Sequence, residues 1–151
     1  MDLLNAQHVF IETSIGTKET ALQFLAQTAQ NLQITTNSAD ILASFNDREM
    51  QGSTGMMDGF AIPHAKSSAI KEASILIVKT KNPIEWDSLD GKPTEVIIAL
   101  LIPEQEAGTT HLKLLSKVAR LLMKDDFKTQ LKELESAAEI AEYVNQQLIE
   151  E

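Results

Sequence analysis

Apolar residues recur with a helical period at both ends of this chain and form continuous runs in its middle. Between Thr17 and Gln30, apolar side chains are spaced three and four residues apart, which predicts a helix whose first turn Thr17 caps (Ala21, Leu22, Leu25, Ala26 and Ala29). A second helix is predicted to begin with Ser38 as its cap and to end before Gly52, with Ile41, Leu42 and Phe45 on its inner face. The first third of the chain is therefore predicted to be helical.

The middle of the chain has short β-rich runs in place of helical spacing. Strands are predicted over Phe60–Ile62, Ser74–Thr80 and Val96–Ile102, and a further strand over His8–Glu12. The run from Val96 to Ile102 is apolar at every position, which is typical of a strand that is covered on both faces. Asn82-Pro83 and Asp90-Gly91-Lys92-Pro93 are expected to interrupt the chain between the last two strands.

The strongest helical pattern runs from Thr110 to Lys124. At about 100° per residue, its leucines, Leu112 among them, fill one half of the helical wheel. Its basic residues occupy the other half, which predicts a solvated face (Lys113, Lys117, Arg120 and Lys124). Two further helices are predicted, over Asp125–Leu134 and after Ser136, which forms a capping box with Glu139. Helices at both ends and a doubly buried central strand predict an α/β fold with helices on both faces of the sheet.

Composition narrows the possible classes of function. The 151 residues, 43% of them apolar, are expected to form a single domain over residues 1–151. A net charge of −9 argues against nucleic acid as a partner. The chain has no cysteine, no membrane-length apolar run and no basic segment followed by an apolar one at its start. Disulfides, thiol nucleophiles and Cys-ligated zinc are excluded, and a cytoplasmic location is expected.

His64 is the first candidate for chemistry. It follows Pro63 at the end of a β-rich run, and this proline biases Ile62 toward an extended conformation. His64 is therefore predicted to lie where a strand meets a loop, the place where ligand sites of sheet proteins are common. Gly55 and Gly59 would let the backbone come near a ligand or partner. A histidine that only hydrogen-bonds a loop is an equally common interpretation of this pattern.

His111 and Arg48 are polar residues on apolar helix faces. His111 falls inside the apolar half of its wheel and is predicted to point toward the sheet. Thr109 and Thr110 are capping types, so this helix end is expected to offer free amides to an anion. A partly buried histidine bonded to a carbonyl is the alternative. The Arg48 guanidinium could bind two phosphate oxygens. It could equally form a salt bridge with a carboxylate or stabilise the C-terminus of its helix.

These three side chains together favour phosphoryl transfer. A neutral imidazole, with an unperturbed pKa of about 6.5, can accept a phosphoryl group and release it again. An arginine and a second histidine would stabilise the transferred charge. Metal binding is a rival use of histidine, but His8, His64 and His111 show no HxH or HExxH spacing. A serine hydrolase is disfavoured because the chain has no G-x-S-x-G motif.

Two distant blocks of the sequence carry a family resemblance. The first comprises Asp47-Arg48-Glu49 and the run from Gly55 to Ala65, with its G-x-A-I-P-H core. The second is Thr110-His111-Leu112 with the leucine-rich pattern H-L-x-x-L-x-x-x-A-x-x-L. With Trp86 and the run Val96–Pro103 between them, these blocks resemble the fructose/mannitol-type enzyme IIA of the bacterial phosphoenolpyruvate-dependent sugar phosphotransferase system.

The resemblance implies a fold, a reaction and partners. The fold would be a mixed sheet flanked by helices. His64 would accept a phosphoryl group from the histidine-containing phosphocarrier protein HPr and pass it to a sugar-specific enzyme IIB. His111 would steady that group by hydrogen bonding, and Arg48 would supply positive charge.

Neither a cofactor nor a metal is implied, and the membrane would be reached only through the IIC permease. The alternative within the superfamily is a regulatory, nitrogen-type module that signals its phosphorylation state to a partner protein.

Overall fold

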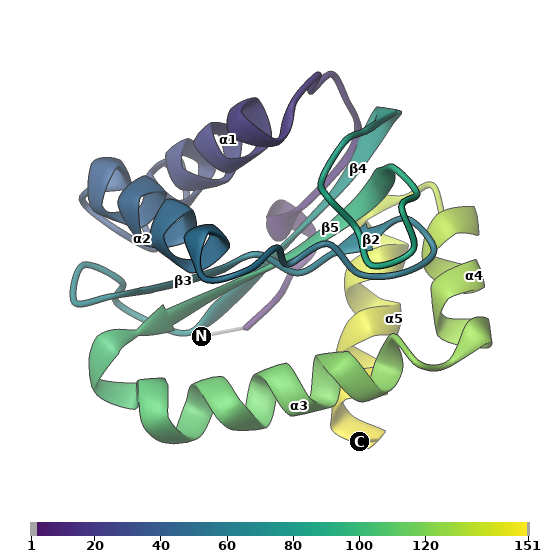
Figure 1. The fold of residues 1–151 in the computed structure, drawn as a ribbon. Coiled ribbons are helices and arrows are strands. Elements are labelled where there is room, and N and C mark those ends of the chain that lie inside the picture. Colours follow the sequence, from purple (N-terminus) through teal and green to yellow (C-terminus); the bar gives the residue numbers. More distant parts are fainter. Residues whose placement is uncertain (1–2, 151) are drawn as a thin grey trace.

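A computed structural model describes residues 3–150, except for the side chains of residues 106, 107 and 110. Within that range one sheet lies between two groups of helices (Figure 1). Its strands are β1 (Val9–Thr13), β2 (Phe60–Ala61), β3 (His64–Ser67), β4 (Ser74–Ile84) and β5 (Thr94–Pro103). The α-helices are α1 (Lys18–Asn31), α2 (Ser38–Met50), α3 (Leu112–Leu121), α4 (Asp125–Glu133) and α5 (Ala137–Glu150). Among the described residues, no helix is both long and apolar enough to cross a membrane.

The sheet is mixed, as the resemblance implied. β4 pairs antiparallel with β5, and β1 adds parallel to the other side of β4. β2 and β3 both pair in parallel with the same side of β5, one after the other along its length. Phe60 lies opposite Val96, and His64 lies opposite Leu100. The predicted α/β architecture with helices on both faces is confirmed (Figure 1).

The central strand β5 is buried on both faces, which explains its apolar run. Ile97, Ala99 and Leu101 pack in the cluster that contains the inner faces of α1 and α2. The alternate residues pack in the second cluster, with the apolar sides of α3, α4 and α5 (Val96, Ile98, Leu100 and Ile102). Because successive side chains of a strand point to opposite faces, β5 needs apolar residues at every position.

The first two helices begin almost where the pattern predicted. Thr17 caps α1, and its hydroxyl accepts a hydrogen bond from the amide of Thr20 at 3.1 Å. The predicted cap of α2 is wrong by one residue, because Asn37 accepts the bond from the Asp40 amide at 3.2 Å. Ser38 is already the first helical residue, and its amide donates to the side chain of Gln30.

Two strand boundaries differ from the prediction. β4 continues through Asn82-Pro83 to Ile84, with a register irregularity after Lys79. Proline is tolerated there because the regular ladder is already interrupted. The strand predicted over Phe60–Ile62 ends at Ala61, and the chain then forms a separate strand that starts at His64. His64 therefore lies where a loop meets a strand, but it begins β3 instead of ending the preceding strand.

The chain enters the long helix earlier than predicted. A 3₁₀ turn (Glu104–Glu106) and a π turn (Ala107–His111) precede α3, and His111 has helical dihedrals. The predicted helix start at Thr110 is wrong, because Thr109 and Thr110 already lie within the π turn, and the side chain of Thr110 lies outside the described part. Leu112 is 63% exposed, contrary to its predicted burial, because it lies across α3 from Leu114 and Val118.

The C-terminal half of the chain agrees more closely with its pattern. α4 and α5 occupy the two predicted segments, and the hydroxyl of Ser136 accepts a hydrogen bond from the Glu139 amide at 3.3 Å. On the predicted solvated face, Lys113, Arg120 and Lys124 are exposed and Lys117 is half-buried.

We expect Asn37→Ala to lower the free energy of unfolding by about 1 kcal/mol, because the first turn of α2 loses its cap. Ser38→Ala is the matched control and should change it by less than about 0.5 kcal/mol. Urea denaturation followed by far-UV circular dichroism measures both. A larger loss from Ser38→Ala would restore the cap predicted from the sequence.

Candidate active site

His64 is held at the edge of the sheet and is buried. Its pairing with Leu100 turns the ring toward the face that carries α3. The side chain is only 5% exposed. Neither ring nitrogen has a hydrogen-bond partner in the described part of the chain, and neither touches solvent. Buried polar atoms are rarely left unpaired, so this ring is a candidate for chemistry and not for loop support.

The structure brings the three candidate residues of the sequence analysis to one pocket. The pocket has a volume of about 350 Å³. It is lined from α2, from β3 and from the end of the π turn (Ser44, Asp47, Arg48, Gln51, His64, Lys66 and His111). The rings of His64 and His111 meet edge to face, with centroids 5.4 Å apart and planes at 62°. Residues 48, 64 and 111 can therefore act on the same small ligand.

His111 reaches the pocket from the last position of the π turn. It is half-buried, and its Nε2 is buried without a hydrogen-bond partner among the described residues. The predicted inward orientation is thus confirmed, while the alternative of a carbonyl bond is absent at that nitrogen. π turns are often found at functional sites. Nε2 remains available to a ligand atom.

Arg48 has two of the three surroundings considered for it, and it forms no salt bridge with the described residues. It lies in the last turn of α2, and its Nη1 donates to the carbonyl of Gly52 at 2.8 Å. It also lines the pocket beside His64. A guanidinium has five N–H donors in a planar fork, so one bond to the helix end leaves donors for an anion.

The electrostatic surroundings keep His64 neutral. Burial is the main cause that lowers its pKa from 6.5 to about 4, and the neighbouring His111 and Arg48 lower it further. The pKa of His111 is also lowered, first by burial and then by the charges of Lys66 and Arg48. Near pH 7 the His64 ring therefore keeps an unprotonated nitrogen, which is the form that acts as a nucleophile.

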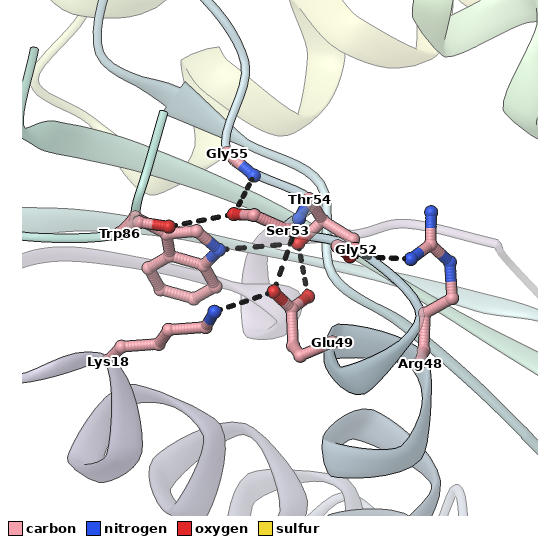
Figure 2. Close-up of polar contacts among 8 residues, drawn as sticks. All are labelled: Lys18, Arg48, Glu49, Gly52, Ser53, Thr54, Gly55 and Trp86. Atoms are coloured by element: carbon pink, nitrogen blue, oxygen red, sulfur yellow. Dashed lines mark hydrogen bonds and ion pairs between the residues drawn. The ribbon is translucent and has the colours of Figure 1, made fainter. Parts of the chain in front are cut away.

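A polar network beside Arg48 holds the loop that leads to His64 (Figure 2). The Glu49 carboxylate pairs with Lys18 Nζ of α1 at 2.8 Å, and it accepts hydrogen bonds from the amide and the hydroxyl of Thr54. The Thr54 hydroxyl in turn accepts a bond from the indole N–H of Trp86 at 3.3 Å. These contacts join α1, the end of α2 and the loop before β5.

The same network continues toward His64. The Ser53 hydroxyl donates to the Trp86 carbonyl and accepts from the Gly55 amide, as Figure 2 shows. The carbonyl of Thr54 accepts a bond from the amide of Ile62 at 3.0 Å, two residues before His64. Gly55 is packed closely, because a Cβ there would lie 3.0 Å from the Cα of Ser88 and would crowd its backbone. The loop geometry that aims His64 thus depends on Glu49 and Thr54.

Sequence reasoning missed three residues around this site. Ser44 is an ordinary polar residue of a helix and gives no signal of its contacts. Glu49 stands in the block Asp47-Arg48-Glu49 that carries the resemblance, but the sequence does not show what its carboxylate contacts. Lys66 has a signal, because it lies two residues after His64 and alternate residues of a strand share a face. The prediction ended the strand before His64, so this relation was not visible. Among the described residues, no group of three histidine, aspartate or glutamate side chains is placed to hold a metal.

Comparison with known proteins identifies the family. A family model described as "Phosphoenolpyruvate-dependent sugar phosphotransferase system, EIIA 2" matches residues 2–147. The chain belongs to the EIIA 2 family. This confirms the resemblance found in the sequence.

Two of the relatives of this EIIA 2 chain, and one solved structure, show the range of proteins that it resembles. It is 38% identical over 100 residues to the "PTS system fructose-specific EIIABC component" of Bacillus subtilis, covering 66% of this chain and 16% of that protein. It is 34% identical over 131 residues to the "Nitrogen regulatory protein" of Bradyrhizobium diazoefficiens, covering 87% and 84%. The solved "Nitrogen Regulatory Protein IIA-Ntr from Neisseria meningitidis" is 30% identical, with a TM-score of 0.85 and coverage of 97% and 96%.

We expect stability to depend on the protonation of His64. Because its pKa is about 4 when folded and 6.5 in its ordinary state, the unfolded chain binds the proton first as pH falls. The wild type should therefore lose about 2 kcal/mol more than His64→Gln between pH 7 and pH 4.5. Urea denaturation at both pH values measures this. Equal losses in the two proteins would contradict the lowered pKa.

We expect Lys18→Met to destabilise the protein by about 2 kcal/mol, because it leaves the buried Glu49 carboxylate without its cation. Trp86, the single tryptophan, should report the change in its fluorescence. Lys92→Met is the matched control, because Lys92 pairs with Asp58 at 3.9 Å on the surface. That control should cost less than about 0.5 kcal/mol, and an equal cost would contradict the role of the network.

Proposed function

We propose that this protein is a phosphohistidine carrier of the sugar phosphotransferase system. His64 accepts a phosphoryl group from the phosphocarrier HPr and passes it to a sugar-specific enzyme IIB during sugar uptake. The observation that supports this most directly is a buried His64 ring, neutral near pH 7, with unpaired nitrogens beside His111 and Arg48. We propose further that residues 1–151 act as one EIIA domain in the cytoplasm.

The chemistry follows from the state of the His64 ring. An unprotonated nitrogen of His64 uses its lone pair to form a bond to phosphorus. The donor's bond to phosphorus breaks as the new bond forms, and the donor nitrogen keeps that electron pair. A neutral histidine is a suitable carrier because its phosphoryl bond is made and broken readily. The reaction needs charge stabilisation and alignment but no cofactor.

His111 and Arg48 supply that stabilisation. Nε2 of His111 is unpaired and can donate a hydrogen bond to a phosphoryl oxygen in the tautomer that carries its proton there. Arg48 adds a permanent positive charge at the same pocket. Because the His64 nitrogens do not touch solvent, a lining side chain has to move before a donor can reach them.

The acceptor follows from the relatives' names. In the fructose-specific relative, the name EIIABC places A, B and C parts in one component. An EIIA segment that is similar to part of such a component is expected to pass its group to a B part. The membrane-bound C part would then be reached only through the B part.

A second function is favoured by two of the similar proteins. The chain is 34% identical over 131 residues to a nitrogen regulatory protein, and its fold matches the solved IIA-Ntr chain with a TM-score of 0.85 at 30% identity. A regulatory protein with the same histidine would accept the group and report its phosphorylation state to a partner. The two functions differ at one step, the transfer from His64 to an enzyme IIB.

We expect incubation with phosphoenolpyruvate, enzyme I and HPr to add one phosphoryl group to the wild type, on His64 by mass spectrometry. His64→Gln should abolish the label. His8→Gln is the matched control, because His8 is equally buried but bonds the Ile75 carbonyl through Nδ1 at 3.0 Å. His111→Ala should still accept the group but pass it to IIB at least about tenfold more slowly.

Each outcome of this labelling experiment is decisive. Labelling of His64→Gln at the wild-type level would refute His64 as the carrier. Normal labelling with no transfer from the wild type to any tested IIB would favour the regulatory function. Transfer at the wild-type rate by His111→Ala would remove the role proposed for that histidine.

A further inference from the structure

Lys66 shares a strand face with His64. The parallel register pairs His64 with Leu100 and Lys66 with Ile102, and both partners pack on the α3 side of the sheet. Ala65, between them, packs in the opposite cluster. The Lys66 side chain therefore leaves β3 on the same side as the His64 ring, and both line the pocket.

The backbone of Lys66 is held against the helix that carries Arg48. The Ser44 hydroxyl accepts a hydrogen bond from the Lys66 amide at 2.8 Å and donates one to the Lys66 carbonyl at 2.9 Å. Ser44 and Arg48 are four residues apart on α2, so they lie on the same side of that helix. This pair of hydrogen bonds between Ser44 and Lys66 fixes the backbone positions of Arg48 and Lys66 relative to one another.

The pocket holds more positive charge than its own residues neutralise. Arg48 and Lys66 are cations, Asp47 is the one carboxylate among the lining residues, and both histidines have lowered pKa values. The Lys66 ammonium forms no ion pair or hydrogen bond with the described part of the chain. A phosphoryl group on His64 would bring about two negative charges into this pocket.

We propose that Lys66 is a second phosphoryl-binding residue, whose ammonium donates to an oxygen of the group carried on His64. This inference rests on the proposed function of His64. The bond to phosphorus forms from the His64 nitrogen and the donor's bond breaks, as above. Lys66 takes no part in that exchange of bonds. It binds the oxygens of the product and so favours the phosphorylated state of this protein over that of the donor.

The first test measures the equilibrium between phosphorylated HPr and phosphorylated protein, with Lys66→Met, Lys66→Arg and the wild type. Lys66→Met should shift it about tenfold toward phosphorylated HPr, because a charge-assisted hydrogen bond is lost. Lys66→Arg should restore it to within about threefold. Lys81→Met, an exposed lysine of β4, is the matched control and should leave it unchanged.

Equilibrium constants that agree between Lys66→Met and the wild type would overturn the role of Lys66 and leave His64 as the carrier. A shift caused equally by Lys81→Met would show a general charge effect and would also overturn it.

A second measurement does not depend on the partners. Unphosphorylated wild type and Lys66→Met are titrated with inorganic phosphate while the ring signals of residues 64 and 111 are followed by NMR. Lys66→Met should raise the dissociation constant about tenfold. Equal constants, or no binding to the wild type, would overturn the proposal. Absence of label on His64 in the partner assay would instead refute the carrier function, and the phosphate titration would still decide the role of Lys66.

Discussion

The parallel pairing of β3 with β5 is the constraint on which the site depends. Opposite Leu100, His64 faces the α3 side of the sheet, where it meets His111 and lies within reach of Arg48. A slip of one residue would turn the ring into the α1 and α2 core, in the place of Ala65. The Thr54 bonds to Glu49 and Ile62, and the Ser44 bonds to Lys66, hold this register from both ends of the pocket.

Burial lowers the pKa of His64 and also limits access to its ring. Removal from water lowers its pKa to about 4, so the ring stays neutral over the whole physiological range. The same burial keeps both nitrogens away from solvent. In the proposed carrier function, this burial protects the His64 nitrogens from water until a partner displaces a lining side chain.

The helices and the doubly covered strand could be predicted because their signals are local. Thr17 caps its helix through its own hydroxyl, and the apolar run of β5 follows from burial on both faces. The predictions were wrong where contacts between distant parts of the chain determine the local structure. The π turn before α3 has no local signal in the sequence, and a strand at His64 exists because β5 offers an unpaired edge. The position of Lys66 beside His64 also depends on this pairing of β3 with β5, so the sequence did not reveal it.

The sequence alone determined which polar side chains stand at positions where the local pattern calls for a different residue type. A histidine after a proline, a histidine within an apolar helix half and an arginine on an inner helix face are visible without a structure, because each breaks a local pattern. Only the tertiary structure decided that the three share one pocket, that Lys66 joins them and that His64 is buried. Distances between segments and access to water depend on how the whole chain packs, and no short stretch of sequence contains that information.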